Sequence, residues 1–116
     1  LKMVGEPLLH SEAILVSNDE KINSLPQAEL FLKRVNGIIV ARKYVMIEYD
    51  IPAKKVEAAC KIAPGLESPT ISQLRDTEWN AVKVMIKTSE INTTMDQLSQ
   101  LGAKAIIVTD LRTCRI

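Results

Sequence analysis

Aromatic side chains and an excess of charge of one sign are both missing from this 116-residue chain. Phe, Trp and Tyr make up 3% of the residues, and 15 basic residues against 14 acidic ones leave a net charge of +1. Recognition of RNA on an open sheet uses aromatic residues on which bases stack. Binding to DNA or to an anionic membrane uses a basic cluster. The composition therefore argues against a nucleic-acid partner and against a membrane partner.

Long apolar runs and cysteine motifs are also missing. No apolar stretch approaches the roughly 20 residues of a membrane span, and the first residues lack the ordered regions of a signal peptide. Cys60 and Cys114 are the only cysteines, and they are far apart, without the spacing of a zinc site. We therefore expect a cytoplasmic protein with two reduced thiols. The chain starts at Leu1 rather than at Met, which is typical of a fragment.

Glycine is too sparse for a phosphate-binding loop. The four glycines stand apart, at positions 5, 37, 65 and 102. His10, Glu78 and Asp110 are possible acids or bases, but no motif pairs any of them with a nucleophile. Glu78 and Asp110 are better explained as surface carboxylates and His10 as a hydrogen-bonded loop imidazole. We therefore predict no catalytic residue and no metal ligand here, and no catalysis by this chain alone.

Three segments have helical periodicity. Ser24-Leu25-Pro26-Gln27 forms a capping box with proline in the first turn, and the apolar residues after it recur at helical steps to about position 42. Alternatively, Gly37 ends this helix and residues 38–40 form a strand. A second helix is predicted from Pro52 to the Pro64-Gly65 stop, and a third after Ser89 with Gly102 as its left-handed C-terminal residue.

Short alternating runs between these helices predict four strands, at residues 44–50, 70–74, 79–87 and 105–111. With the second and third helices they give the order βαββαβ, an α+β ferredoxin-like sandwich of the ACT/PII-like kind. Two helices cover one face of such a sheet. Along the first strand, Val45 and Ile47 alternate with Tyr44, Met46 and Tyr49, which we place on the opposite face. Because both faces are largely apolar, we expect a partner or ligand on the uncovered face.

The first 22 residues fall outside this unit. Residues 1–4 and 12–16 are predicted to be strands, but βαββαβ has no place for them. We assign residues 1–22 to the sheet of a larger body, residues 23–42 to a connecting helix, and residues 43–116 to the ferredoxin-like domain.

The loop Pro64-Gly65-Leu66-Glu67-Ser68-Pro69-Thr70 has two opposite explanations. Its prolines and glycine fix its shape before anything binds, which favours a ligand loop. The same residues would also serve simply to stop one helix and start a strand.

Several stretches together resemble a known family. They are Gly5-Glu6-Pro7, Ser11-Glu12-Ala13, Tyr44-Val45-Met46-Ile47-Glu48-Tyr49-Asp50, the loop just described, Trp79, Gly102-Ala103-Lys104-Ala105 and Asp110-Leu111-Arg112-Thr113-Cys114-Arg115. The chain resembles the C-terminal part of the long form of ATP phosphoribosyltransferase, most of all its actinobacterial members. The family's threonine- and glycine-rich phosphate loop is absent.

The resemblance implies a function in regulation. That enzyme, with Mg²⁺, joins ATP to phosphoribosyl pyrophosphate in the first step of L-histidine biosynthesis, and L-histidine inhibits it through a C-terminal ferredoxin-like domain. The implied partners are L-histidine, the catalytic domains and other copies of the regulatory domain in a dimer or hexamer. The implied mechanism is allosteric, because histidine would bias one arrangement of subunits.

The resemblance also implies ligand-binding positions for L-histidine. They are Asp50, Leu66, Ser68, Thr70, Met85 and Ala105. Asp50 would meet the ligand's ammonium or imidazolium group, although it would otherwise cap the helix predicted from Pro52. Met85 stands where the family has an aliphatic wall, and its thioether fills a similar volume. The alternative function, from another class, is an oligomerisation module without a small-molecule ligand.

Overall fold

A four-stranded antiparallel sheet is the centre of the structure. The computed structural model describes residues 5, 9, 11–18 and 20–116. The strands are β1 (Tyr44–Pro52), β2 (Thr70–Gln73), β3 (Trp79–Lys87) and β4 (Lys104–Asp110), in the spatial order β2-β3-β1-β4. Each pair of neighbours is antiparallel. The predicted βαββαβ order is confirmed, and the predicted strand limits are correct to within two residues.

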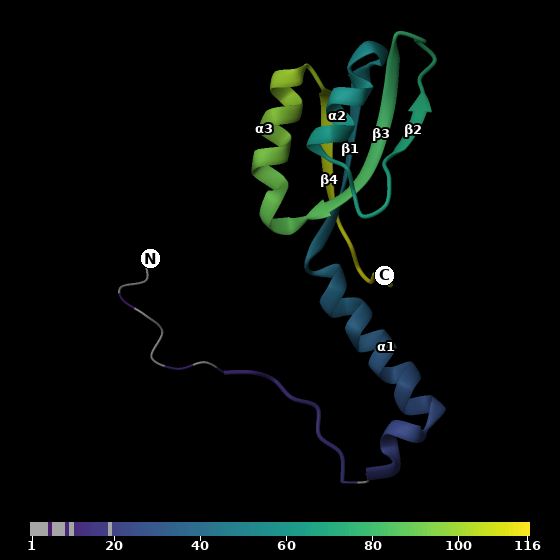
Figure 1. Cartoon of the computed structure of the whole chain (residues 1–116), viewed down its shortest axis with the longest axis vertical. Coiled ribbons are helices and arrows are strands. Elements are labelled where there is room, and N and C mark those ends of the chain that lie inside the picture. Colours follow the sequence, from purple (N-terminus) through teal and green to yellow (C-terminus); the bar gives the residue numbers. More distant parts are fainter. Residues whose placement is uncertain (1–4, 6–8, 10, 19) are drawn as a thin grey trace.

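Helices α2 (Val56–Ile62) and α3 (Ile91–Leu101) lie together on one face of this sheet (Figure 1). Each follows a short 3₁₀ turn, η2 (Ala53–Lys55) or η3 (Thr88–Glu90). Helix α3 ends where the sequence predicted, because Gly102 adopts a left-handed φ of 101° that residues with a Cβ rarely take.

The core lies between the sheet and these two helices. Alternate residues of β1 and β3 point into it and meet small or apolar residues of α2 and α3. The fully buried large side chains are Tyr49, Ile47, Ile51, Leu98, Val45 and Val82. Residues of opposite parity on the same strands therefore point to the other face of the sheet.

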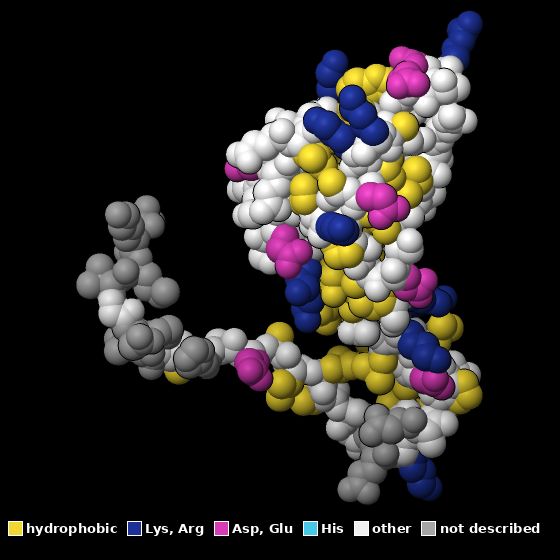
Figure 2. Space-filling view, turned by 45° about the horizontal axis from the view of Figure 1, so that its top comes forward, with side chains coloured by type: hydrophobic (Ala, Val, Ile, Leu, Met, Phe, Trp, Pro, Cys, Tyr) yellow, Lys and Arg dark blue, Asp and Glu magenta, His cyan; other side chains and the backbone are white. Residues whose placement is uncertain are grey.

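Helix α1 (Pro26–Ala41) extends away from the sheet, and the 3₁₀ turn η1 (Glu20–Ser24) precedes it (Figure 1). It runs through Gly37, so the alternative in which residues 38–40 form a strand is wrong. Large apolar side chains of α1 are exposed, including Phe31 at 52% and Ile38 at 49%. Figure 2 shows hydrophobic side chains gathered on this part of the molecule. No described helix is long and apolar enough to cross a membrane.

Three expectations from the sequence are wrong. Tyr49 is buried on the helix-covered face because it has the parity of Val45 and Ile47. The second helix begins at Val56 rather than Pro52, because β1 continues in register with β3 until Pro52 faces Trp79. Residues 12–16 form no strand, since none of the strands in the described part of the chain pairs with them. The strand predicted at 1–4 lies outside the described residues, as does His10.

Both cysteines are free thiols, as predicted. Burial raises the pKa of the Cys60 thiol, and the nearby charge of Glu57 adds to the effect. A thiol with a raised pKa has little thiolate at neutral pH, so Cys60 is suited to packing rather than to nucleophilic chemistry.

Candidate ligand-binding site

The sheet face opposite α2 and α3 is covered by neither of these helices and combines charged with apolar side chains. Glu48 of β1 faces Lys83 of β3 on one side and Ile107 of β4 on the other. The Glu48 carboxylate and the Lys83 ammonium form an ion pair across the two strands. Ile107 is 54% exposed beside this pair. We call this surface the open face.

A hollow of about 340 Å³ lies on the open face around Asp50. Asp50 shares it with Thr70 and Ser72 of β2, Lys83 of β3 and Ala105 of β4. We call it the carboxylate cavity. It brings together three of the predicted histidine-binding residues, Asp50, Thr70 and Ala105, from three different strands.

The Asp50 carboxylate has no partner among the described residues. Its side chain is half-buried within β1, and no hydrogen bond or ion pair joins it to another described group. The alternative role, as a helix cap, is wrong. The residues that precede η2 and α2 are Pro52 and Lys55, and neither end has a side-chain cap. A half-buried carboxylate that no described group bonds favours binding of a positively charged group.

Ala105 enters the carboxylate cavity on a strained backbone. The pairing of β1 with β4 shifts by one residue between Glu48, which faces Ile107, and Asp50, which faces Lys104. Ala105 lies in this irregularity with φ of 48°, and it is the one non-glycine residue of the described chain with positive φ. Bulges re-aim side chains beside binding sites, and strain of this kind gathers at functional sites.

A second hollow, of about 240 Å³, lies where the loop after α2 meets the end of β3 that β2 does not reach. Leu66 of the loop and Met85 and Tyr44 of the sheet line it. Gly65 fixes the loop there, because its φ is 74° and a Cβ on it would lie 2.7 Å from Val84 Cγ2. We call this hollow the loop cavity.

The structure divides the predicted site residues between the two cavities. Leu66 and Met85 line the loop cavity, whereas Asp50, Thr70 and Ala105 line the carboxylate cavity. Tyr44 and Asp50 mark the two cavities on β1 and are separated by about 20 Å of extended strand. Ser68 lines neither cavity and is exposed; its hydroxyl donates a long hydrogen bond of 3.5 Å to the carbonyl of Pro69.

Sequence reasoning missed two polar groups of the carboxylate cavity. Ser72 and Lys83 line it beside Thr70. The sequence could have indicated both, because residues paired across neighbouring strands share a face. Asp50 pairs with Ala81, which pairs with Ser72, and Lys83 lies two residues after Ala81 on the same face.

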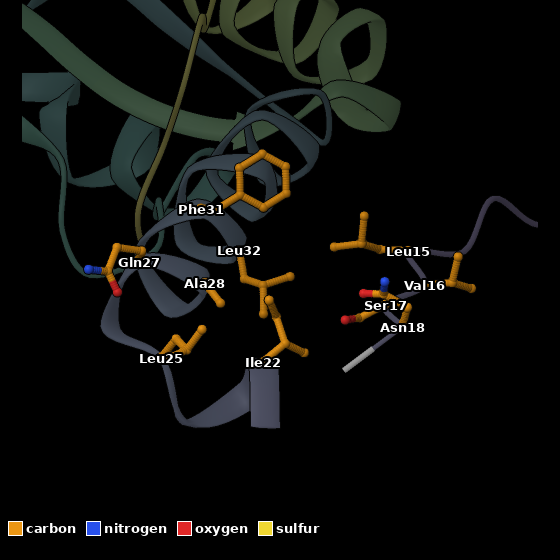
Figure 3. Close-up of a pocket in the computed structure, with 10 residues that line it drawn as sticks. All are labelled: Leu15, Val16, Ser17, Asn18, Ile22, Leu25, Gln27, Ala28, Phe31 and Leu32. Carbon is orange, nitrogen blue, oxygen red and sulfur yellow. The ribbon is translucent and has the colours of Figure 1, made fainter. Parts of the chain in front are cut away.

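A larger hollow than these two lies elsewhere, between α1 and the extended segment before it (Figure 3). It measures about 1140 Å³ and is mainly apolar, with Leu15 and Val16 on the extended segment and Ile22, Phe31 and Leu32 on the opposite side. It lacks a charged group to orient a small ligand. Within residues 5, 9, 11–18 and 20–116, no three His, Cys, Asp or Glu side chains gather to hold a metal ion.

Comparison with known proteins gives one consistent answer. Residues 41–113 match the family described as HisG, C-terminal domain. The whole chain is 48% identical to an ATP phosphoribosyltransferase of Salinibacter ruber and 44% identical to one of Bifidobacterium longum. It is 43% identical, over 120 aligned positions, to that of Paenarthrobacter aurescens. Two of these organisms are actinobacteria, the group that the sequence indicated.

The alignments cover all of this chain but only 41% of the Salinibacter and Bifidobacterium proteins and 42% of the Paenarthrobacter protein. The family match spans the sheet, both of its helices and the first three residues after β4. The chain belongs to the HisG C-terminal domain family.

Proposed function

We propose that this chain is the regulatory part of an ATP phosphoribosyltransferase and that it binds free L-histidine, the product of the pathway. Binding would inhibit the attached catalytic region, which joins ATP to phosphoribosyl pyrophosphate in the first step of L-histidine biosynthesis in the cytoplasm. The observation that carries the proposal is the unpartnered, half-buried Asp50 carboxylate in a cavity that also contains Thr70 and Ala105.

The chemistry of the carboxylate cavity suits an amino acid. The Asp50 carboxylate would accept hydrogen bonds from the ligand's ammonium group, and the Thr70 hydroxyl can donate or accept another. The Lys83 ammonium, already paired with Glu48, lies close enough to line the same hollow and could meet the ligand's own carboxylate. The small side chain of Ala105 leaves room above β4.

Two copies of the chain would complete the site. One histidine cannot span both cavities, because Tyr44 and Asp50, which mark them on β1, lie about 20 Å apart along the strand. The apolar wall of Leu66 and Met85 would come from a neighbouring copy whose loop cavity faces the first copy's carboxylate cavity. Ser68 belongs to the same proposed wall, at its rim. The open face, with Ile107 exposed on the edge strand β4, supports such a contact within a dimer or hexamer.

The domain limits follow from this proposal. Residues 43–116 form the ferredoxin-like regulatory domain, residues 23–42 the connecting helix, and residues 1–22 part of the catalytic region. The apolar side chains exposed on α1 support contact with a further protein body. Mg²⁺ and the phosphoribosyl transfer would then belong to the remainder of a longer enzyme, since this chain spans only 41% of the Salinibacter relative.

Calorimetric titration with L-histidine tests the proposal. We expect saturable binding by the wild-type chain, loss of binding in Asp50→Ala, and unchanged binding in Asp96→Asn, whose exposed carboxylate lies outside both cavities. D-histidine serves as the ligand control. A folded oligomer that takes up no L-histidine would contradict the proposal.

A second function, subunit assembly without a ligand, is favoured by one observation. Ile107 is exposed on the same open face that would join two copies. Sedimentation in the presence and absence of L-histidine separates the two functions, because an assembly module would keep the same oligomeric state and the same stability at every histidine concentration.

A further inference from the structure

Gly37 lies in the middle of α1, where glycine weakens a helix. It is one of two buried residues of that otherwise exposed helix. A Cβ on Gly37 would lie 2.8 Å from the Thr113 hydroxyl oxygen and 3.2 Å from the Cys114 carbonyl oxygen. The missing side chain therefore allows the segment after β4, residues 111–116, to lie directly on the helix backbone.

A hydrogen bond fixes this approach. The Cys114 amide donates to the carbonyl of Gly37 over 2.9 Å. A carbonyl oxygen has two lone pairs, so the Gly37 carbonyl can accept this bond as well as the one within the helix. Figure 1 shows the chain after β4 running toward the sheet-proximal end of α1. We call residues 111–116 the strap.

The other side of the strap touches the sheet. The Cys114 thiol lies 4.0 Å from the Met85 sulfur and donates a weak hydrogen bond to it. Met85 is a wall of the loop cavity. One residue of the strap, Cys114, thus contacts α1 through its amide and the loop cavity through its side chain.

Apart from the strap, α1 is attached to the sheet through its own continuation into β1. There the Thr88 amide donates to the Lys43 carbonyl over 2.9 Å, and the Thr88 hydroxyl donates to the Arg42 carbonyl over 3.2 Å. These bonds hold Arg42 and Lys43, the two residues that follow the last turn of the helix. A helix attached at one end can change its angle to the sheet, and a second attachment at Gly37 restricts that angle.

We propose that the strap couples the position of α1 to the wall of the loop cavity, through the contacts Gly37–Cys114 and Cys114–Met85. This inference rests on the proposed function, because it gives L-histidine bound beside Met85 a physical route to the helix that leads to the rest of the enzyme. A ligand that moves Met85 changes the position of the Cys114 side chain packed against it. The hydrogen bond from the Cys114 amide to Gly37 changes with it.

Hydrogen exchange of the Cys114 amide, measured by NMR on the full chain, tests the strap without any ligand. Gly37→Ala should speed this exchange by about tenfold, roughly the effect of one lost hydrogen bond. Asn36→Ala, on the exposed neighbour, should leave it unchanged, and central β1 amides should stay protected in both variants. Unchanged Cys114 exchange in Gly37→Ala would overturn the proposal.

Separate variants test the contact between the strap and the wall of the loop cavity. Met85→Ala should speed Cys114 exchange severalfold, whereas Met46→Ala, which faces Met85 from β1, should not. Saturating L-histidine should slow Cys114 exchange in the wild type. If histidine shifts the amide signals of Gly65 and Leu66 but Cys114 exchange stays constant, the coupling is wrong and the proposed function stands. If histidine does not bind, the proposed function fails, and the Met85→Ala result alone decides whether the strap contacts the cavity wall.

Discussion

Asp50 and Leu66 line two different cavities of the same chain, at opposite ends of β1. Both positions are proposed to contact one histidine, so the contact requires two copies. This relationship predicts complementation between variants. Asp50→Ala damages one half of every site and Leu66→Phe the other, so each variant alone should lose L-histidine binding by about tenfold or more. Mixed subunits, however, should contain some sites built from two intact halves.

Calorimetric stoichiometry after refolding the two variants together measures this effect. In a symmetric dimer, half of the molecules are mixed and each has one intact site, so about a quarter of all sites should return. The matched control mixes Asp50→Ala with Thr70→Val, which damage the same cavity and should restore nothing. Equal recovery in both mixtures, or in neither, would contradict a shared site.

Ala105 gives a prediction about stability. A left-handed backbone costs a residue with a Cβ about 1–2 kcal/mol, and glycine avoids this cost. Ala105→Gly should therefore raise the free energy of unfolding by about 1 kcal/mol in urea titration. Ala81→Gly is the control, because Ala81 lines the same cavity without positive φ. It should lower stability by about 0.5–1 kcal/mol. The same sign for both variants would mean that the strain at Ala105 is absent.

The sheet and its helices were predictable because local signals agreed with tertiary packing. The alternation from Trp79 to Lys87 matches β3 residue for residue, and Gly102 ends α3 as expected. Residues 12–16 are also mostly apolar but form no strand. Local pattern alone cannot supply the neighbouring strand that a ladder requires.

The family resemblance grouped Asp50 and Leu66 in one proposed site, but it did not indicate that they line two different cavities. That separation depends on where each residue lies along the folded sheet. The strain at Ala105 depends on a shift in pairing between β1 and β4, so it could not be inferred from either strand alone. The sequence suggested that Gly37 could end the helix. The structure instead explains this glycine by its close contact with the distant residues Thr113 and Cys114.

Lys55 connects the two helices of the domain. Its ammonium group donates a 2.7 Å hydrogen bond to the carbonyl of Leu101, at the C-terminal end of α3, where the helix dipole favours a cation. Lys55→Met keeps most of the side-chain length and removes this bond. We expect the free energy of unfolding to fall by about 1–2 kcal/mol in urea titration. Lys54→Met changes an exposed neighbour in the same 3₁₀ turn and should shift stability by no more than about 0.5 kcal/mol.

Tyr49 has a buried hydroxyl group without a hydrogen-bond partner among the described residues. Leaving such a group unpaired costs about 1–3 kcal/mol, whereas Phe has no hydroxyl to desolvate. Tyr49→Phe should therefore equal or exceed the wild type in stability at neutral pH, by up to about 1 kcal/mol once the small cavity left behind is included. A clear loss of stability would show that the hydroxyl has a partner.

The same residue predicts a pH dependence. Burial raises the pKa of Tyr49 from 10.0 to about 12, and the neighbouring Cys60 adds to the shift. Below pH 10.0 the phenol is protonated in both the folded and the unfolded chain, so its contribution to stability does not change with pH. Between pH 10.0 and about 12 the unfolded chain loses the proton first, and stability falls as pH rises. Other groups also titrate in this range, so the quantity to measure is the difference between wild type and Tyr49→Phe in urea titrations across it. The advantage of Tyr49→Phe should grow with pH through this window; a constant difference would mean that the phenol is not buried in the folded chain.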